Sequence, residues 1–158
     1  MTLSHNNIRG EVPHFQSYCI ASYLDLSFNS FNGQVPLFPS EKMENIFFHT
    51  NIFSGTMPKN IGEMLPNLRL LELASNFITG RIPPSIGMLK NLENLVLRSN
   101  SLFGELPPHW EDLRSLNLLD VANNNISGKL PSSMQFLSSL KWLSLEKIII
   151  LQGNSLHS

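Results

Sequence analysis

The chain has 158 residues, and 11 Lys and Arg against 12 Asp and Glu give a formal net charge of −1 at pH 7. This balance offers no basic surface to a nucleic-acid backbone and no polybasic stretch to a membrane face. A hydrophobic content of 42% argues against disorder, and a single cysteine excludes a disulfide framework and a cysteine metal cluster. The composition is uneven, with 26 Leu and 17 Asn but only 3 Ala, which disfavours a helical bundle.

One asparagine recurs about every 24 residues along the chain, and the residue types around it recur with it. In chain order these asparagines are Asn6, Asn29, Asn51, Asn76, Asn100 and Asn124. Each is followed by an apolar residue after two positions, a glycine after four and a proline after seven. Six copies of this pattern in register indicate an internal repeat, and a repeat of this length is typical of a solenoid.

Upstream of each asparagine the pattern reads L-x-x-L-x-L-x-x-N, and the alternation around L-x-L predicts a short strand with one buried face. The expected strands lie around residues 24–26, 46–48, 71–73, 95–97, 119–121 and 143–145. A repeat of about 24 residues cannot bury its own apolar side, so successive copies are expected to stack. Stacking predicts a parallel sheet with strands about 4.8 Å apart.

The asparagines are expected to form a structural ladder. Their side chains would point inward and satisfy backbone N–H and C=O groups where the chain leaves each strand. The following glycine permits a tight bend, and the proline fixes φ without donating a hydrogen bond. Apolar residues spaced by three after the prolines predict short helical turns on the outer side, for example over residues 83–89 and 107–113.

The complete pattern, L-x-x-L-x-L-x-x-N-x-L-x-G-x-I-P, resembles the plant-specific class of leucine-rich repeats. The chain is most similar to the extracellular domains of plant receptor-like proteins and receptor-like kinases, as in the segment LDLSFNSFNGQVPLFPSEKMENIFF. This resemblance implies an α/β solenoid, a curved superhelix with a parallel sheet on its concave face. It also implies a second small strand beside each main one, and short 3-10 or helical turns and loops on the convex face.

Residues 1–145 are expected to hold about six repeats, the first incomplete, and residues 146–158 an irregular tail with a displaced partial repeat. The next ladder asparagine should be residue 148, but that residue is Ile, and the pattern resumes six residues late at Ile149. The connection over residues 36–43 is too short and too proline-broken for a normal convex turn. Because Met1 falls inside a strand pattern and no caps, signal peptide or membrane helix are recognisable, we expect a fragment of a longer receptor-like protein or a truncated gene copy.

Catalytic constellations are not apparent in the sequence. The five histidines lack the spacing of a zinc site, and no G-x-G-x-x-G phosphate loop or G-x-S-x-G elbow occurs. Cys19 has no evident base beside it and is expected to be a buried structural thiol rather than a nucleophile. We therefore expect a protein that is not an enzyme and that needs no cofactor.

Outward-facing strand residues are the candidates for ligand contact on the concave face, with Tyr23 and Phe47 expected to be exposed. The candidate residues are Tyr23, Asp25, Phe47, His49, Glu72 and Arg98. An alternative interpretation is purely structural, because a further column of charges alternates in sign through Glu44, Arg69 and Glu93. Opposite charges on adjacent strands support pairing by about 0.2–1 kcal/mol each without any ligand.

Asn125, in the motif Asn125-Ile126-Ser127, is the candidate site of N-glycosylation, and its side chain is expected to point outward.

The resemblance implies a plant cell-surface module at the extracellular side of the plasma membrane, active in defence or developmental signalling. Its expected partners are a peptide, microbial or protein ligand and a co-receptor kinase, with no nucleic acid. Two alternatives stay open: a secreted inhibitor of cell-wall-degrading enzymes, similar to polygalacturonase-inhibiting proteins, and a truncated product with no function of its own. The short 36–43 connection favours a long receptor ectodomain over the compact inhibitor.

Overall fold

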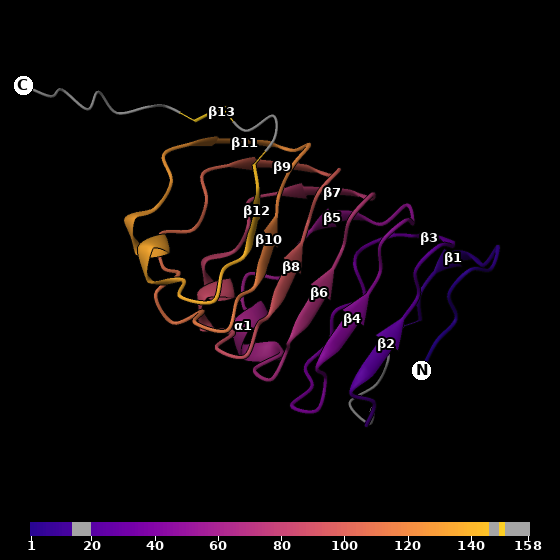
Figure 1. The fold of residues 1–158 in the computed structure, drawn as a ribbon. Helices are drawn as coiled ribbons and strands as arrows, with labels where there is room; N and C mark the ends of the chain where they lie inside the picture. Colours follow the sequence, from indigo (N-terminus) through magenta and orange to yellow (C-terminus); the bar gives the residue numbers. More distant parts are fainter. Residues whose placement is uncertain (14–19, 146–148, 151–158) are drawn as a thin grey trace, which may run out of the picture.

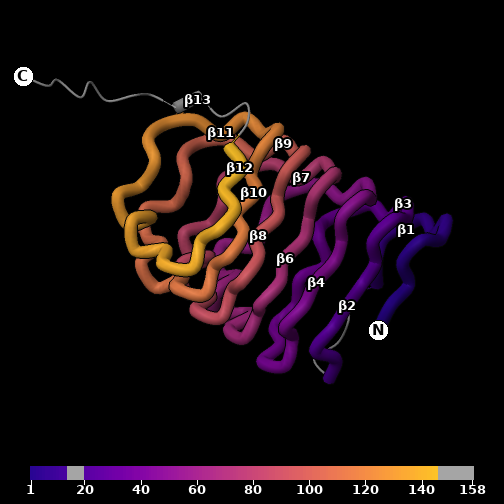
Figure 2. The backbone as a smooth tube through the Cα atoms, viewed as in Figure 1, coloured from indigo at the N-terminus to yellow at the C-terminus, as the bar shows by residue number. Residues whose placement is uncertain are grey.

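The computed structural model describes residues 1–13, 20–145 and 149–150. The chain winds into a row of stacked coils that form a curved solenoid (Figure 1), and the backbone tube shows each coil lying against the next (Figure 2). This architecture confirms the predicted α/β leucine-rich-repeat solenoid. Position 19, where a buried thiol was predicted, lies outside the described residues.

The main sheet is parallel and six-stranded, and it runs along the concave face of the solenoid. Its strands are β2 (Tyr23–Asp25), β4 (Asn45–Phe47), β6 (Leu70–Glu72), β8 (Asn94–Val96), β10 (Leu118–Asp120) and β12 (Trp142–Ser144). They follow one another in chain order, because every coil contributes one strand and pairs it with the strand of the next coil. The central residue of each strand from β2 to β10 is buried, as the L-x-L pattern predicts.

A second set of short strands lies beside the main sheet, as the resemblance implies. It consists of β5 (Ser54–Thr56), β7 (Phe77–Gly80), β9 (Ser101–Gly104), β11 (Asn125–Gly128) and β13 (Ile149–Ile150) in one sheet, and of β1 (Arg9–Glu11) paired with β3 (Ser30–Asn32). The displaced repeat predicted from Ile149 onward lies mostly outside the described residues. Its first two residues form β13 and pair with β11 of this second sheet.

The convex side carries α1 (Ile61–Met64) and the 3-10 helices η1 (Pro84–Met88) and η2 (Ser132–Phe136). The turn expected over residues 83–89 is therefore present as η1. Over residues 107–113 the expected turn is present as a single turn, closed by a 3.0 Å hydrogen bond from Leu113 N–H to Trp110 O, and it does not extend into a helix. The connection 36–43 contains no helix, in agreement with its short length.

One hydrophobic core runs through the stack, built from the strand leucines, the apolar residue after each ladder asparagine and the convex apolar residues. Trp110 is the largest side chain that is fully buried. Because each coil shares its core with its neighbours, the concave side chains are held by the coils on either side of them.

Candidate functional site: the concave face

The asparagine ladder fixes the edge of the concave face. Asn51 Oδ1 accepts a hydrogen bond from Phe31 N of the preceding coil, and its Nδ2 donates to Leu26 O and Phe48 O, at distances of 3.0, 2.9 and 3.2 Å. Four further asparagines bond to their own and the preceding coil in the same way: Asn29, Asn76, Asn100 and Asn124. Asn6 donates to Leu3 O and Ser4 O of its own coil.

The residue before each ladder asparagine has a left-handed backbone. These residues are His5, Phe28, Thr50, Ser75, Ser99 and Asn123, with φ between 52° and 57°. Phe28, at φ 52° and 42% exposed, is the bulkiest of them, and a non-glycine residue in this region costs about 1–2 kcal/mol. Phe28 was not among the site residues predicted from the sequence, although an aromatic residue among small and polar ones at this position is a recognisable signal.

The Phe28 ring contacts two histidines, His5 on the preceding coil and His49 on the following coil. The ring stacks on His5 with centroids 4.3 Å apart and meets His49 edge to face at 5.0 Å. His49 Nε2 in turn lies 3.8 Å from Glu72 Oε2, which makes an ion pair when His49 is protonated. The structure therefore brings the predicted residues His49 and Glu72 together, and it adds His5 and Phe28 to them.

Tyr23, Phe47 and Asp25 form a second group on β2 and β4. The rings of Tyr23 and Phe47 lie 5.3 Å apart, and Asp25 is aligned with Phe47 across the two strands. Tyr23 is 41% exposed, as expected, but Phe47 is half-buried and packs against the Tyr23 ring. The expectation that Phe47 is exposed was wrong.

Burial and neighbouring polar groups shift the pKa values of the two ionisable residues of this cluster, Tyr23 and Asp25. Partial burial and the nearby Asp25 carboxylate raise the pKa of the Tyr23 phenol, whose oxygen lies 3.4 Å from Asp25 Oδ2. Burial alone would raise the pKa of Asp25, but bonds from the Ser27 hydroxyl and N–H, at 2.6 and 2.9 Å, outweigh it and lower that pKa. Asp25 is therefore held ionised on the concave face.

We expect Ser27→Ala to raise the pKa of Asp25 and to lower stability by about 1 kcal/mol at pH 7, because one hydrogen bond to a charged group is lost. The folded pKa lies below the ordinary value of about 3.9, so this contribution is present above that pH and disappears as pH falls through the folded pKa. Carboxyl-carbon NMR titration and urea unfolding at pH 7 and pH 3 measure both effects. Ser22→Ala, an exposed serine on the same coil, is the control, and an unchanged Asp25 pKa in S27A would contradict the assignment.

Arg98 forms an ion pair with Asp120, since its Nη1 is 3.5 Å from Asp120 Oδ2. The alternating charge column is confirmed as a structural feature. Arg69 Nη1 lies 3.9 Å from Glu44 Oε2 and Arg69 Nη2 lies 2.7 Å from Glu93 Oε1, and each of the three residues directly precedes a strand of the main sheet. The concave face therefore combines an aromatic and histidine region on β2 to β6 with a paired-charge region that extends to β10.

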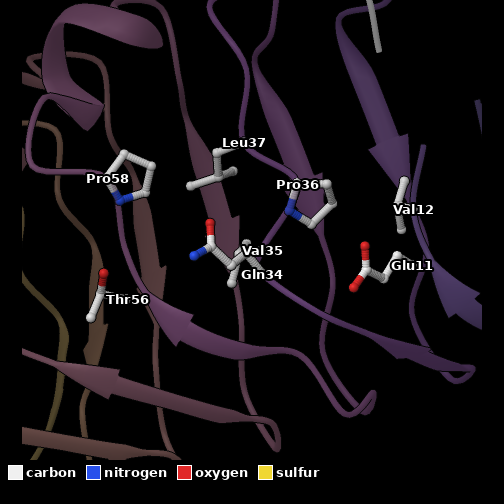
Figure 3. Close-up of a pocket in the computed structure, with 8 residues that line it drawn as sticks. All are labelled: Glu11, Val12, Gln34, Val35, Pro36, Leu37, Thr56 and Pro58. Carbon is white, nitrogen blue, oxygen red and sulfur yellow. The ribbon is translucent and has the colours of Figure 1, made fainter. Parts of the chain in front are cut away.

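A hollow of about 540 Å³ lies away from this face, beside the second sheet (Figure 3). Its lining is Glu11, Val12, Gln34, Val35, Pro36, Leu37, Thr56 and Pro58. It lies where the 36–43 connection lacks a helix, and the Glu11 carboxylate is the single charged group of its lining. The concave face offers many more recognition groups than this hollow.

Within the described residues, no group of three or more His, Cys, Asp or Glu side chains is placed to hold a metal ion. In the same part of the chain, every helix is too short to cross a membrane.

Stacked coils with an inner asparagine ladder and a polar, aromatic concave face define the leucine-rich-repeat class of solenoid. Two models of the leucine-rich-repeat family match residues 67–89 and 90–156, and the chain belongs to this family.

The relatives of the chain are plant receptor-like proteins. Receptor-like protein 35 from Arabidopsis thaliana is 36% identical over 88 residues, which is 52% of this chain and 9% of that protein. Receptor-like protein EIX2 from Solanum lycopersicum is 34% identical over 87 residues, 52% of this chain and 8% of that protein. The chain thus spans about a tenth of the length of these curated relatives.

Solved ectodomains of plant receptor kinases share the fold. The Arabidopsis receptor kinase HAESA, in complex with the peptide hormone IDA and the co-receptor SERK1, matches with a TM-score of 0.88 and 34% identity over 94% of this chain and 25% of that one. GASSHO1/SCHENGEN3 from Arabidopsis thaliana, in complex with CASPARIAN STRIP INTEGRITY FACTOR 2, matches with a TM-score of 0.85 and 34% identity over 94% of this chain and 18% of that one. These matches confirm the resemblance to plant receptor-like ectodomains.

Proposed function

We propose that this chain forms part of the ligand-recognition surface of a plant cell-surface receptor-like protein. It binds a peptide or protein ligand non-covalently through its concave face, at the extracellular side of the plasma membrane. Recognition without catalysis, and a co-receptor as a further partner, belong to the same proposal. The observation that carries it is Phe28, an exposed aromatic residue held at positive φ between two histidines on the concave face.

The backbone of Phe28 supports this proposal on energetic grounds. The left-handed conformation recurs in every coil, so the fold requires it there whatever the side chain. Asn, as at Asn123, tolerates this conformation far better than Phe. An unfavourable residue at such a position is typical of functional surfaces, where the side chain is needed for contact.

The chemistry of the surface indicates what it would bind. Tyr23, Phe28 and Phe47 provide rigid aromatic area, which is typical of the residues that dominate binding energy. Asp25, Glu72 and the two histidines surround this area with hydrogen-bonding and charged groups. Such a surface suits an extended peptide that presents both apolar and basic side chains.

The receptor relatives support the same interpretation. HAESA, whose ectodomain has the same fold, was solved with a peptide hormone and a co-receptor, and the plant receptor RGFR1 was solved with RGF2. Receptor-like proteins from two plants share the repeat sequence of this chain. We assign the same type of ligand to the concave face of this protein.

Peptides selected from a random peptide library against the purified chain provide the probe for a test. We expect Phe28→Ala and Tyr23→Ala each to weaken binding of the selected peptides at least about 5-fold, because loss of an aromatic anchor costs more than about 1 kcal/mol. Phe77→Ala is the matched control, because Phe77 is 62% exposed but lies on β7 of the second sheet. Selected peptides that are insensitive to both concave variants would refute the concave site.

A further inference from the structure

Asn125 occupies an exposed position at the start of β11 and begins the single N-x-[ST] motif of the chain. Successive side chains of a strand alternate between its faces, so Asn125 and Ser127 lie on one face while Ile126 is buried in the core. The adjacent ladder asparagine, Asn124, points inward and is hydrogen-bonded to two coils. A sugar on Asn125 would therefore leave the core and the ladder untouched.

Phe103 is the residue directly opposite Asn125 on the neighbouring strand. The pairing of β9 with β11 aligns Asn125 with Phe103 and Ile126 with Gly104. Neighbouring strands lie about 4.8 Å apart, so the two outward side chains start from adjacent positions on one surface. Phe103 is 44% exposed, so part of its aromatic side chain is uncovered on the strand next to that of the acceptor.

We propose that Asn125 carries an N-linked glycan whose first sugar packs against the ring of Phe103. The inference rests on the extracellular location given in the proposed function, because the modification needs the secretory pathway. The Asn125 amide nitrogen attacks C1 of the sugar in a lipid-linked oligosaccharide pyrophosphate. The N–C1 bond forms, the C1–O bond to the pyrophosphate breaks, and the amide loses one proton as the lipid pyrophosphate leaves.

The contact follows from the chemistry of the two groups. One face of an N-acetylglucosamine ring carries C–H groups, and an aromatic ring with its negative face exposed is a suitable partner for them. Packing removes apolar surface of Phe103 from water, and this surface is otherwise exposed in the folded protein. The glycan would lie along the second sheet, beside β9 and β11 and away from the concave face formed by β2, β4, β6 and β8 (Figure 1).

Phe77 provides a matched comparison within the same sheet. It is an exposed aromatic residue on β7, and β9 separates β7 from β11. Its strand therefore lies two strand spacings, about 10 Å, from that of Asn125, beyond direct contact with the first sugar. The two phenylalanines differ in their distance from the acceptor and share the same sheet.

The test uses the full chain expressed with an added secretion leader in plant cells, followed by peptide mass mapping and enzymatic trimming of the glycan to its first sugar. We expect Asn125 to be occupied, and the trimmed protein to melt about 2–4 °C above N125Q, the shift that a roughly fivefold change in the folding equilibrium causes in a chain of this size. The difference should disappear when both proteins carry Phe103→Ala and persist when both carry Phe77→Ala.

A second measurement needs no variant. The ring current of Phe103 should shift proton resonances of the first sugar upfield in the NMR spectrum of the trimmed wild-type protein. An unmodified Asn125 would overturn the site, whether or not the concave face binds peptides. Equal glycan effects in the F103A and F77A backgrounds, or unshifted sugar protons, would overturn the contact with Phe103. Loss of peptide binding with an intact glycan effect would concern the proposed function alone.

Discussion

Replacement of Asn76 by alanine is expected to lower the free energy of unfolding by about 3–5 kcal/mol, because each buried polar group left without a partner costs about 1–3 kcal/mol. Asn76 is only 6% exposed. Its Oδ1 accepts from Phe53 N at 3.0 Å, and its Nδ2 donates to Phe48 O and Leu73 O at 3.0 and 3.1 Å. Alanine can replace none of these bonds. The substitution leaves backbone groups of two successive coils without their partners.

Urea unfolding of the wild-type chain and the variant measures this effect. Asn32→Ala is the matched control, because Asn32 is exposed on β3 and its replacement should change stability by less than about 0.5 kcal/mol. A loss below about 1 kcal/mol for N76A would show that water replaces the ladder bonds at this position. A large loss for N32A would show that the cost is not specific to the ladder.

The main sheet could be predicted from sequence because its register follows the asparagine ladder. Asp25 and Phe47, each four residues before a ladder asparagine, are paired in the structure, and Phe47 is paired with Glu72 in the same way. The pattern also predicts which side chains face outward, so Tyr23, Asp25, His49 and Glu72 could be placed on the concave face. The strong period of the sequence and the burial of one face leave little freedom there.

The register of the second sheet could not be predicted from the sequence. Counting from the ladder would pair Thr79 with Ser54, but the structure pairs Thr79 with Thr56. The same stagger of two residues aligns Phe103 with Asn125 instead of Ser127. Strand alternation restricts such a shift to an even number of residues, since an odd shift would turn buried side chains outward. Strand alternation cannot distinguish a register shift of zero residues from one of two residues.

Contacts between side chains of different coils also could not be predicted from the sequence. Phe28 and His49 belong to different repeats and to different positions within the repeat, so no periodic pattern relates them. The half-burial of Phe47 depends on the orientation of the Tyr23 ring on the neighbouring strand β2. These pairings decide the chemistry of the concave face, whereas the ladder decides only which residues can reach it.

Gly62→Ala should be the next most damaging change, with a loss of about 3 kcal/mol. Helix propensity alone predicts the opposite sign, since Ala is favoured over Gly in a helix by about 1 kcal/mol. A Cβ atom on Gly62 of α1 would lie only 2.1 Å from Ser85 O and 2.9 Å from Met88 Cβ of η1. The obstacle is backbone, so α1 and η1 would have to separate.

Thermal and urea unfolding of G62A and of Glu63→Ala separate the two effects. Glu63 is the next residue of α1 and is exposed, so E63A tests helix propensity without the contact and should stay within about 0.5 kcal/mol of wild type. Gly87 has the same relation to the following coil, where an added Cβ would lie 2.3 Å from His109 O, and G87A should be destabilising as well. A stabilised G62A would mean that the convex turns can move apart freely, and that the ladder and the two sheets alone hold successive coils together.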